Sequence, residues 1–141
     1  MMERAEIENV VPHRAPFLWI DRVLELAPGI RCVAVKWVDP EEPALGGHFP
    51  GRPILPGIFL IEAVAQTAGV MLGSAAPPEP GATPLLAAVN CFKFLQPVLP
   101  GQELRIVTTM LTRAGKMACI EGKVTVNGVT VAVGELTVLS A

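Results

Sequence analysis

The sequence predicts an α+β fold in which one long helix packs against one antiparallel β-sheet. Segment 57–72 is apolar nearly all round, which is typical of a helix buried on most sides. Late in the chain, extended segments follow one another with only turns between them, and strands connected in this way pair antiparallel. The 141 residues suit a single domain with a substantial core, so we expect one domain over residues 1–141.

The first part of the chain carries short elements. Residues 7–11 suit one helical turn that Pro12 stops. Strands are expected at 17–26 and 31–38. Residues 40–56 are rich in proline and glycine and are expected to lack regular structure.

The long helix and the remaining strands follow that loop. Pro56 suits the start of a helix over residues 57–72, and Gly73 suits its end. Four more strands are expected, at residues 85–94, 103–112, 117–126 and 129–139. Asn127-Gly128, a strong signal for a tight hairpin turn, joins the last two.

The composition excludes several classes of protein. A content of 51% hydrophobic and 17% charged residues excludes disorder, and a net charge of −2 gives no reason to expect nucleic-acid binding. No apolar run reaches the ~18 residues of a membrane span, because Glu62 and Gln66 interrupt the best window. The N-terminus lacks the apolar segment of a signal peptide. Three cysteines without metal-ligand spacing fit reduced thiols in the cytoplasm.

A histidine and a glutamate stand out as candidates for chemistry. His48 lies in a loop whose prolines restrict the backbone, and Glu62 follows fourteen positions later inside the apolar helix. Histidine exchanges a proton near neutral pH, and burial among aliphatic side chains raises the pKa of a carboxyl. The pair therefore indicates acid–base chemistry on a small organic substrate. Two structural alternatives stay open: Glu62 pairs with a buried arginine such as Arg22 or lies on an exposed helix edge, and His48 caps a backbone carbonyl.

The residues around this pair complete a candidate site. Gln66 lies four positions after Glu62 and therefore shares its helix face. Gly57 and Ile58 open the helix, where free N–H groups and the helix dipole favour an anion. Such donors suit an oxyanion that develops on a thioester carbonyl. Base, acid and oxyanion donors need not meet within one subunit.

Several other polar and aromatic residues have simpler interpretations. His13 and Arg14 are expected to shape the N-terminal turn. Asp21 and Arg22 are expected to form an ion pair on a strand, and the two tryptophans are expected to lie in the core, at Trp19 and Trp37.

Three segments together resemble a known family. Residues 48–66 read H-F-P-G-x-P-x-x-P-G-I-x-x-x-E-A-x-A-Q and look like the active-site signature of FabZ-type 3-hydroxyacyl-[acyl-carrier-protein] dehydratases. Residues 11–23, V-P-H-R-A-P-F-L-W-I-D-R-V, are similar to the N-terminal motif of that family, and residues 94–101 resemble its F-K-R-P-V-x-P-G segment. A glutamate at position 62, rather than aspartate, favours the FabZ type over FabA-type enzymes, which also isomerise the double bond.

The resemblance implies a hot-dog fold, in which a curved antiparallel sheet of about five to six strands wraps a long central helix. It also implies dehydration of (3R)-3-hydroxyacyl thioesters on an acyl carrier protein to trans-2-enoyl thioesters, without a metal or redox cofactor. The family forms homodimers, often assembled into hexamers, with each active site at the dimer interface. His48 of one subunit would then face Glu62 of the other.

The resemblance also implies individual roles. His48 removes the C2 proton, Glu62 protonates the leaving 3-hydroxyl, and the N–H of Gly57 polarises the thioester carbonyl. Gln66 would hold Glu62 or its water. Two neighbours of the dyad would support the site, Phe49 and Pro56.

The chain departs from the family pattern in two places. Where the family has a basic R-F-K-R cluster, residues 93–96 read K-F-L-Q, so carrier docking is expected to use Lys93, Arg52 and Arg113. The acyl tunnel, expected at Leu85, Leu86 and Phe94, has aliphatic residues where the family often places an aromatic gate. Both departures are compatible with a specialised acyl or polyketide-like pathway. A hot-dog thioesterase and a non-catalytic hot-dog subunit remain as alternative functions.

Overall fold

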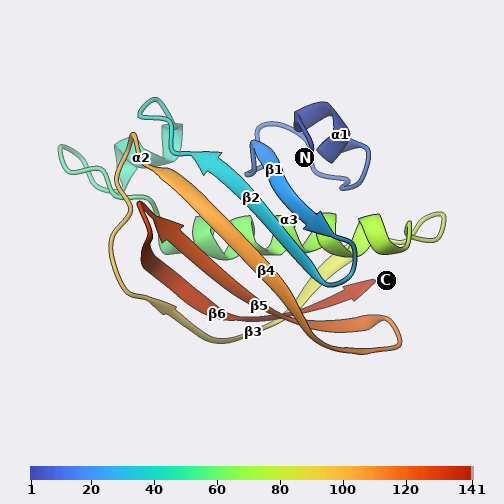
Figure 1. Cartoon of the computed structure of the whole chain (residues 1–141). Helices are drawn as coiled ribbons and strands as arrows, with labels where there is room; N and C mark the ends of the chain where they lie inside the picture. Colours follow the sequence, from blue (N-terminus) through green and yellow to red (C-terminus); the bar gives the residue numbers. More distant parts are fainter. Residues whose placement is uncertain (141) are drawn as a thin grey trace.

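A computed structural model describes residues 1–140 and shows one long helix against a six-stranded antiparallel sheet (Figure 1). The strands lie in the order β1-β2-β4-β5-β6-β3. This arrangement confirms the predicted α+β class. In chain order, the elements are α1 (Arg4–Glu8), β1 (Arg22–Ala27), β2 (Arg31–Trp37), α2 (Pro43–Gly47), α3 (Gly57–Ala75), β3 (Pro84–Phe94), β4 (Glu103–Ala114), β5 (Met117–Val126) and β6 (Val129–Ser140).

The sheet curves around α3, and glycine permits the close approach of the two. Val64 of α3 is fully buried and lies over Gly122 of β5, where an added Cβ would collide with the Val64 methyl groups. Gly122 pairs in register with Gly134 of β6, which in turn lies under the ring of Phe92. Glycine weakens a strand, so these two positions indicate that close packing decides the residue type here.

Helix α3 is the core helix of this fold. Eight of its 19 residues are buried, and 44% of its most apolar window is buried inside the molecule. Among the residues described, α3 alone is long and apolar enough to cross a membrane, by length and composition. Glu62 and Gln66 interrupt the apolar run, yet the 19-residue helix is apolar enough on average to meet this criterion. Core helices of soluble proteins meet it as well.

The turn chemistry of the β5–β6 hairpin follows the prediction. Asn127 and Gly128 both have positive φ, at 48° and 79°, which a two-residue turn of this kind requires. Other boundaries differ. Helix α3 extends three residues beyond the predicted end, and α1 begins and ends earlier than the predicted turn at 7–11.

Two segments were predicted wrongly. Residues 17–21 are not strand: the N–H groups of Phe17 and Leu18 both bond to the Arg14 carbonyl in a turn, so β1 begins only at Arg22. Within residues 40–56, α2 forms a short helix. Pro43 stands in its first turn, where proline loses no hydrogen bond.

The polar pairs also differ from the prediction. Asp21 pairs with Arg4 at 3.5 Å and with Lys36 at 3.3 Å, whereas Arg22 is exposed. Trp19 is buried as predicted, but Trp37 is 47% exposed. Trp37 is the last residue of β2, where the strand ends.

Strand β3 forms one outer edge of the sheet, next to β6 (Figure 1). Its 11 residues are mostly exposed, and four large apolar side chains face solvent in the single chain: Leu85, Leu86, Val89 and Phe94. A long apolar edge strand is a template for pairing with another strand.

Candidate active site

His48 is held by the loop that precedes α3. Its Nδ1 lies 2.8 Å from the Ile54 carbonyl oxygen, and its ring stacks on Phe49 with ring centroids 4.2 Å apart. A carbonyl only accepts, so Nδ1 carries the hydrogen and donates it. Nε2 therefore keeps its lone pair and can accept a proton. The predicted alternative, that His48 caps a carbonyl, and the predicted base are thus compatible.

A cavity of about 510 Å³ opens at His48. Phe94 and Gly57 both line it, and an added Cβ on Gly57 would lie 2.9 Å from Phe94 Cε1. The N–H groups of Gly57 and Ile58 precede the first intrahelical hydrogen bond and have no acceptor within the helix. The cavity thus joins a basic nitrogen to two free backbone donors.

Glu62 lies one and a half turns further along α3 and is fixed through one oxygen. Gln66 Nε2 donates to Glu62 Oε1 at 2.9 Å. The Glu62 side chain is 25% exposed in the single chain, so its burial is partial. The alternative pairing with Arg22 is wrong, because Arg22 lies exposed on β1.

Gln66 is completely buried, and its amide orientation follows from backbone partners. Its Oε1 accepts the Trp19 N–H at 2.6 Å, and its Nε2 donates to the Phe17 carbonyl at 2.9 Å. An N–H can only donate and a carbonyl can only accept, so the NH₂ group must face Glu62. Glu62 Oε1 is therefore an acceptor, which leaves Oε2 as the oxygen that can carry a carboxyl hydrogen.

His13 was expected mainly to shape the N-terminal turn, but the structure brings it to the site. His13 Nε2 lies 3.7 Å from Glu62 Oε1. The two residues are 49 positions apart, and no local pattern signals their approach. The P-H-R motif at 12–14 was the one available signal, through the family resemblance.

His48 and Glu62 do not meet within one chain. Glu62 is absent from the lining of the His48 cavity, and its polar partners among residues 1–140 are Gln66 and His13. A dyad of these two residues thus requires a second copy of the chain.

A second cavity, of about 320 Å³, lies beside the C-terminal half of α3. Gly69 and Gly73 line it and continue the helix face that carries Glu62. Arg113 is also among the residues that line it. Leu85 and Leu86 line neither cavity.

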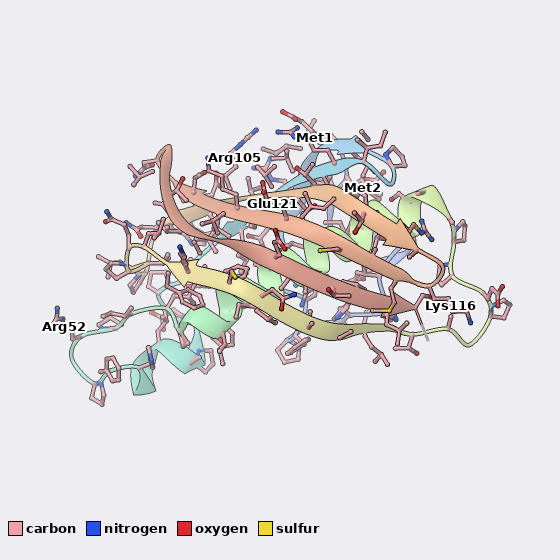
Figure 2. The ribbon with its side chains drawn as sticks, turned by 90° about the horizontal axis from the view of Figure 1, so that it is seen from below. Met1, Met2, Arg52, Arg105, Lys116 and Glu121 are labelled. Atoms are coloured by element: carbon pink, nitrogen blue, oxygen red, sulfur yellow. The ribbon has the colours of Figure 1, made fainter. Side chains whose placement is uncertain are left out.

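The three residues expected to dock a carrier are separated. Arg52 extends from a loop at one end of the molecule, opposite Lys116 at the other end (Figure 2). Arg113 lies three residues before Lys116, and both line the second cavity. Lys93 is exposed and adjoins Phe94, which lines the His48 cavity.

The comparisons with known proteins agree with this geometry. A family model described as a FabA-like domain matches residues 11–135, which places the chain in the FabA-like class of hot-dog proteins. Among solved structures, the dehydratase heterocomplex ApeI:P from Xenorhabdus doucetiae superposes with a TM-score of 0.80 at 22% identity, covering 96% of this chain and 90% of that one. This likeness confirms the predicted hot-dog fold.

The curated relatives are more specific. The 3-hydroxyacyl-[acyl-carrier-protein] dehydratase FabZ of Geotalea uraniireducens is 43% identical over 137 residues, covering 96% of this chain and 94% of the relative. FabZ of Symbiobacterium thermophilum is 50% identical over 103 residues, covering 73% and 72%. The chain therefore belongs to the FabZ dehydratase family, whose members are hydro-lyases. This confirms the predicted family and enzyme class.

Proposed function

We propose that the protein dehydrates (3R)-3-hydroxyacyl thioesters to trans-2-enoyl thioesters, in fatty-acid biosynthesis or a related acyl pathway. The observation that carries the proposal is that the protein binds one atom of each catalytic group and leaves the other free. His48 is held through Nδ1, and Glu62 is held through Oε1. The FabZ relatives support the same reaction.

The free atoms suit the two proton transfers. His48 Nε2 takes the C2 proton, the electrons of that bond form the C2–C3 double bond, and the C3–O bond breaks. Glu62 Oε2 gives its proton to the departing hydroxyl, which leaves as water. The N–H of Gly57 polarises the thioester carbonyl while C2 loses its proton. Groups of this kind each contribute about 10²–10⁴ in rate. Proton transfers alone complete the reaction, so the proposal includes no cofactor.

The proposed catalytic unit is a homodimer joined through β3. The exposed apolar residues of this edge strand would pair with the same strand of a second copy, in a two-fold symmetric contact. Such a contact brings the His48 loop of one subunit toward the α3 helix of its partner. Assembly of three dimers into a hexamer remains a further prediction.

The substrate would enter at the His48 cavity. We assign the thioester to this cavity, next to Phe94 and Gly57, and the acyl chain to the helix face that leads from Glu62 to Gly69. An acyl carrier protein in the cytoplasm would present the substrate, docking on Arg52 and Lys93 at this end of the molecule. Leu85 and Leu86 remain tunnel predictions that depend on the partner subunit.

A thioester assay tests the reaction. Purified protein is incubated with 3-hydroxybutyryl and crotonyl thioesters of a carrier protein or pantetheine, and hydration, dehydration and free thiol are followed together. Reversible water exchange without thiol release is the expected result. Thiol release would instead indicate a thioesterase, and absence of turnover would indicate a non-catalytic subunit.

Subunit mixing tests the composition of the dyad. His48→Ala and Glu62→Gln chains are each expected to be inactive as folded dimers. If they are unfolded and refolded together, about half of the dimers are mixed by random pairing, and each mixed dimer holds one intact site. Recovery of about a quarter of wild-type activity is expected. No recovery, with mixed dimers demonstrated by mass spectrometry, would place both residues of each site in one chain.

A further inference from the structure

His13 lies against the proposed acid, and the mechanism above leaves it unused. Its Nε2 is 3.7 Å from Glu62 Oε1, and both side chains are about a quarter exposed. Its Nδ1 is buried and has no hydrogen-bond partner among the residues described. An orphaned buried N–H is rarer and costlier than an orphaned acceptor. The hydrogen of the neutral ring is therefore assigned to Nε2, where it points toward Glu62.

Two N–H groups thus converge on one carboxyl oxygen. Gln66 Nε2 donates to Glu62 Oε1 at 2.9 Å, and the His13 Nε2–H approaches the same atom. We propose that His13 is a positioning residue for Glu62, an inference that rests on the proposed dehydratase function. Together with Gln66 it directs Oε2 to the 3-hydroxyl. Once Oε2 has given up its proton, the His13 N–H stabilises the charge on the carboxylate. His13 itself neither gains nor loses a proton.

The surroundings of His13 keep its ring in place. The ring stacks on Phe17 with centroids 6.0 Å apart. The Arg14 guanidinium donates to the carbonyls of Val11 and His13, at 3.0 and 2.8 Å, and so fixes the loop. Two charged groups therefore bear on the ring: Glu62 from α3, and Arg14 from its own loop. Only Glu62 lies within ion-pair distance among residues 1–140.

Kinetics of three variants separate positioning from loop structure. His13→Phe keeps the stacked ring but removes the N–H, whereas His13→Gln restores an N–H. Arg14→Gln loosens the same loop without touching Glu62 and serves as the control. The His13 Nε2–H faces the carboxylate at 3.7 Å, beyond hydrogen-bond distance, so His13→Phe is expected to lower kcat by about 3–10-fold, less than for a full charged hydrogen bond. KM should stay within about twofold of wild type, since His13 acts through Glu62 and not on bound substrate.

The pH dependence of activity separates the two roles, because a purely structural role of His13 would not shift it. Without the His13 donor the Glu62 carboxylate is less stabilised, so the limb that reports protonated Glu62 should shift to higher pH in His13→Phe. His13→Gln should restore most of kcat and the original limb, and Arg14→Gln should leave the limb unmoved. Equal losses in both His13 variants with an unmoved limb would overturn the proposal.

A measurement independent of turnover tests the tautomer assigned to His13. The chain has two histidines, His13 and His48, so their ¹⁵N imidazole signals can be assigned with one variant. The structure assigns them opposite neutral tautomers: hydrogen on Nε2 in His13 and on Nδ1 in His48. Hydrogen on Nδ1 of His13 in an active enzyme would overturn this inference alone. An inactive wild-type protein would defeat the proposed function, and the kinetic role of His13 with it.

Discussion

Replacement of Gln66 by leucine tests whether this buried amide organises the site. Leucine has a similar size, but it removes all three hydrogen bonds of the amide, to Trp19 N–H, the Phe17 carbonyl and Glu62 Oε1. The buried Trp19 N–H loses its partner at about 1–3 kcal/mol, and the part-buried Phe17 carbonyl loses its partner at about 1 kcal/mol. The added apolar burial offsets about 1 kcal/mol, because the methylenes of glutamine are already buried. We expect a net loss of about 1–3 kcal/mol of unfolding free energy.

Activity should fall together with stability. Without Gln66, Glu62 Oε1 has no donor at hydrogen-bond distance among residues 1–140. A displacement of about 1 Å of a catalytic group costs on the order of 10²-fold, so kcat should fall by about 10–100-fold in the fraction that stays folded. Urea unfolding at fixed protein concentration measures the stability, and crotonyl-thioester hydration measures the activity.

Thr67 provides the matched control. It is fully buried on the same helix, and its hydroxyl donates to the Ala63 carbonyl at 2.8 Å, away from Glu62. Thr67→Val should cost less than about 1 kcal/mol and leave kcat unchanged, because that carbonyl keeps its helical hydrogen bond. The reasoning is refuted if Gln66→Leu unfolds within 1 kcal/mol of wild type, or if its kcat equals that of Thr67→Val.

Three further predictions follow from close contacts and burial. Gly57→Ala should lower activity while leaving thermal stability nearly unchanged, since the new methyl would lie 2.9 Å from the half-exposed Phe94 ring and displace it into the cavity; an unchanged kcat/KM would count against this. Gly122→Ala should cost about 1–3 kcal/mol in urea unfolding, because Val64 cannot withdraw from a packed core; a neutral effect would contradict the packing. Burial raises the pKa of the Cys32 thiol to about 12, so at pH 8 it should react with a disulfide reagent only as fast as the protein unfolds, and rapid native-state labelling would refute this.

Local chemistry accounts for what the sequence predicted well. The apolar pattern of residues 57–72 predicts α3, and Asn127-Gly128 predicts its hairpin turn because both positions need positive φ. The prediction of a strand from Phe17 was wrong because the N–H groups of Phe17 and Leu18 bond to the Arg14 carbonyl in a turn, and the next N–H, of Trp19, bonds to Gln66. No sequence pattern specifies the strand order, since it depends on which strand edges meet after the chain has collapsed.

The candidate site also has one part that local sequence predicts and another that depends on the tertiary fold. Gln66 could be placed next to Glu62 because four residues make one helical turn. The backbone partners that orient its amide lie 47 and 49 positions away along the chain. His13 is likewise 49 positions from Glu62. Contacts between segments this distant depend on the tertiary fold, so the family resemblance alone indicated that the P-H-R motif mattered.

The two proposed catalytic groups share one design although they lie on different kinds of structure. His48 lies on a loop made rigid by prolines, and Glu62 lies on the most buried helix of the fold. In each, an atom that does not react is fixed by the protein: Nδ1 by a backbone carbonyl, and Oε1 by the Gln66 amide. The reacting atom is thereby both oriented and left without a competing partner. This explains why a buried, fully hydrogen-bonded glutamine occupies position 66, where core packing alone would favour an apolar residue. It also predicts that changes to these anchors reduce kcat more than KM, because they alter where the proton goes and not where the thioester binds.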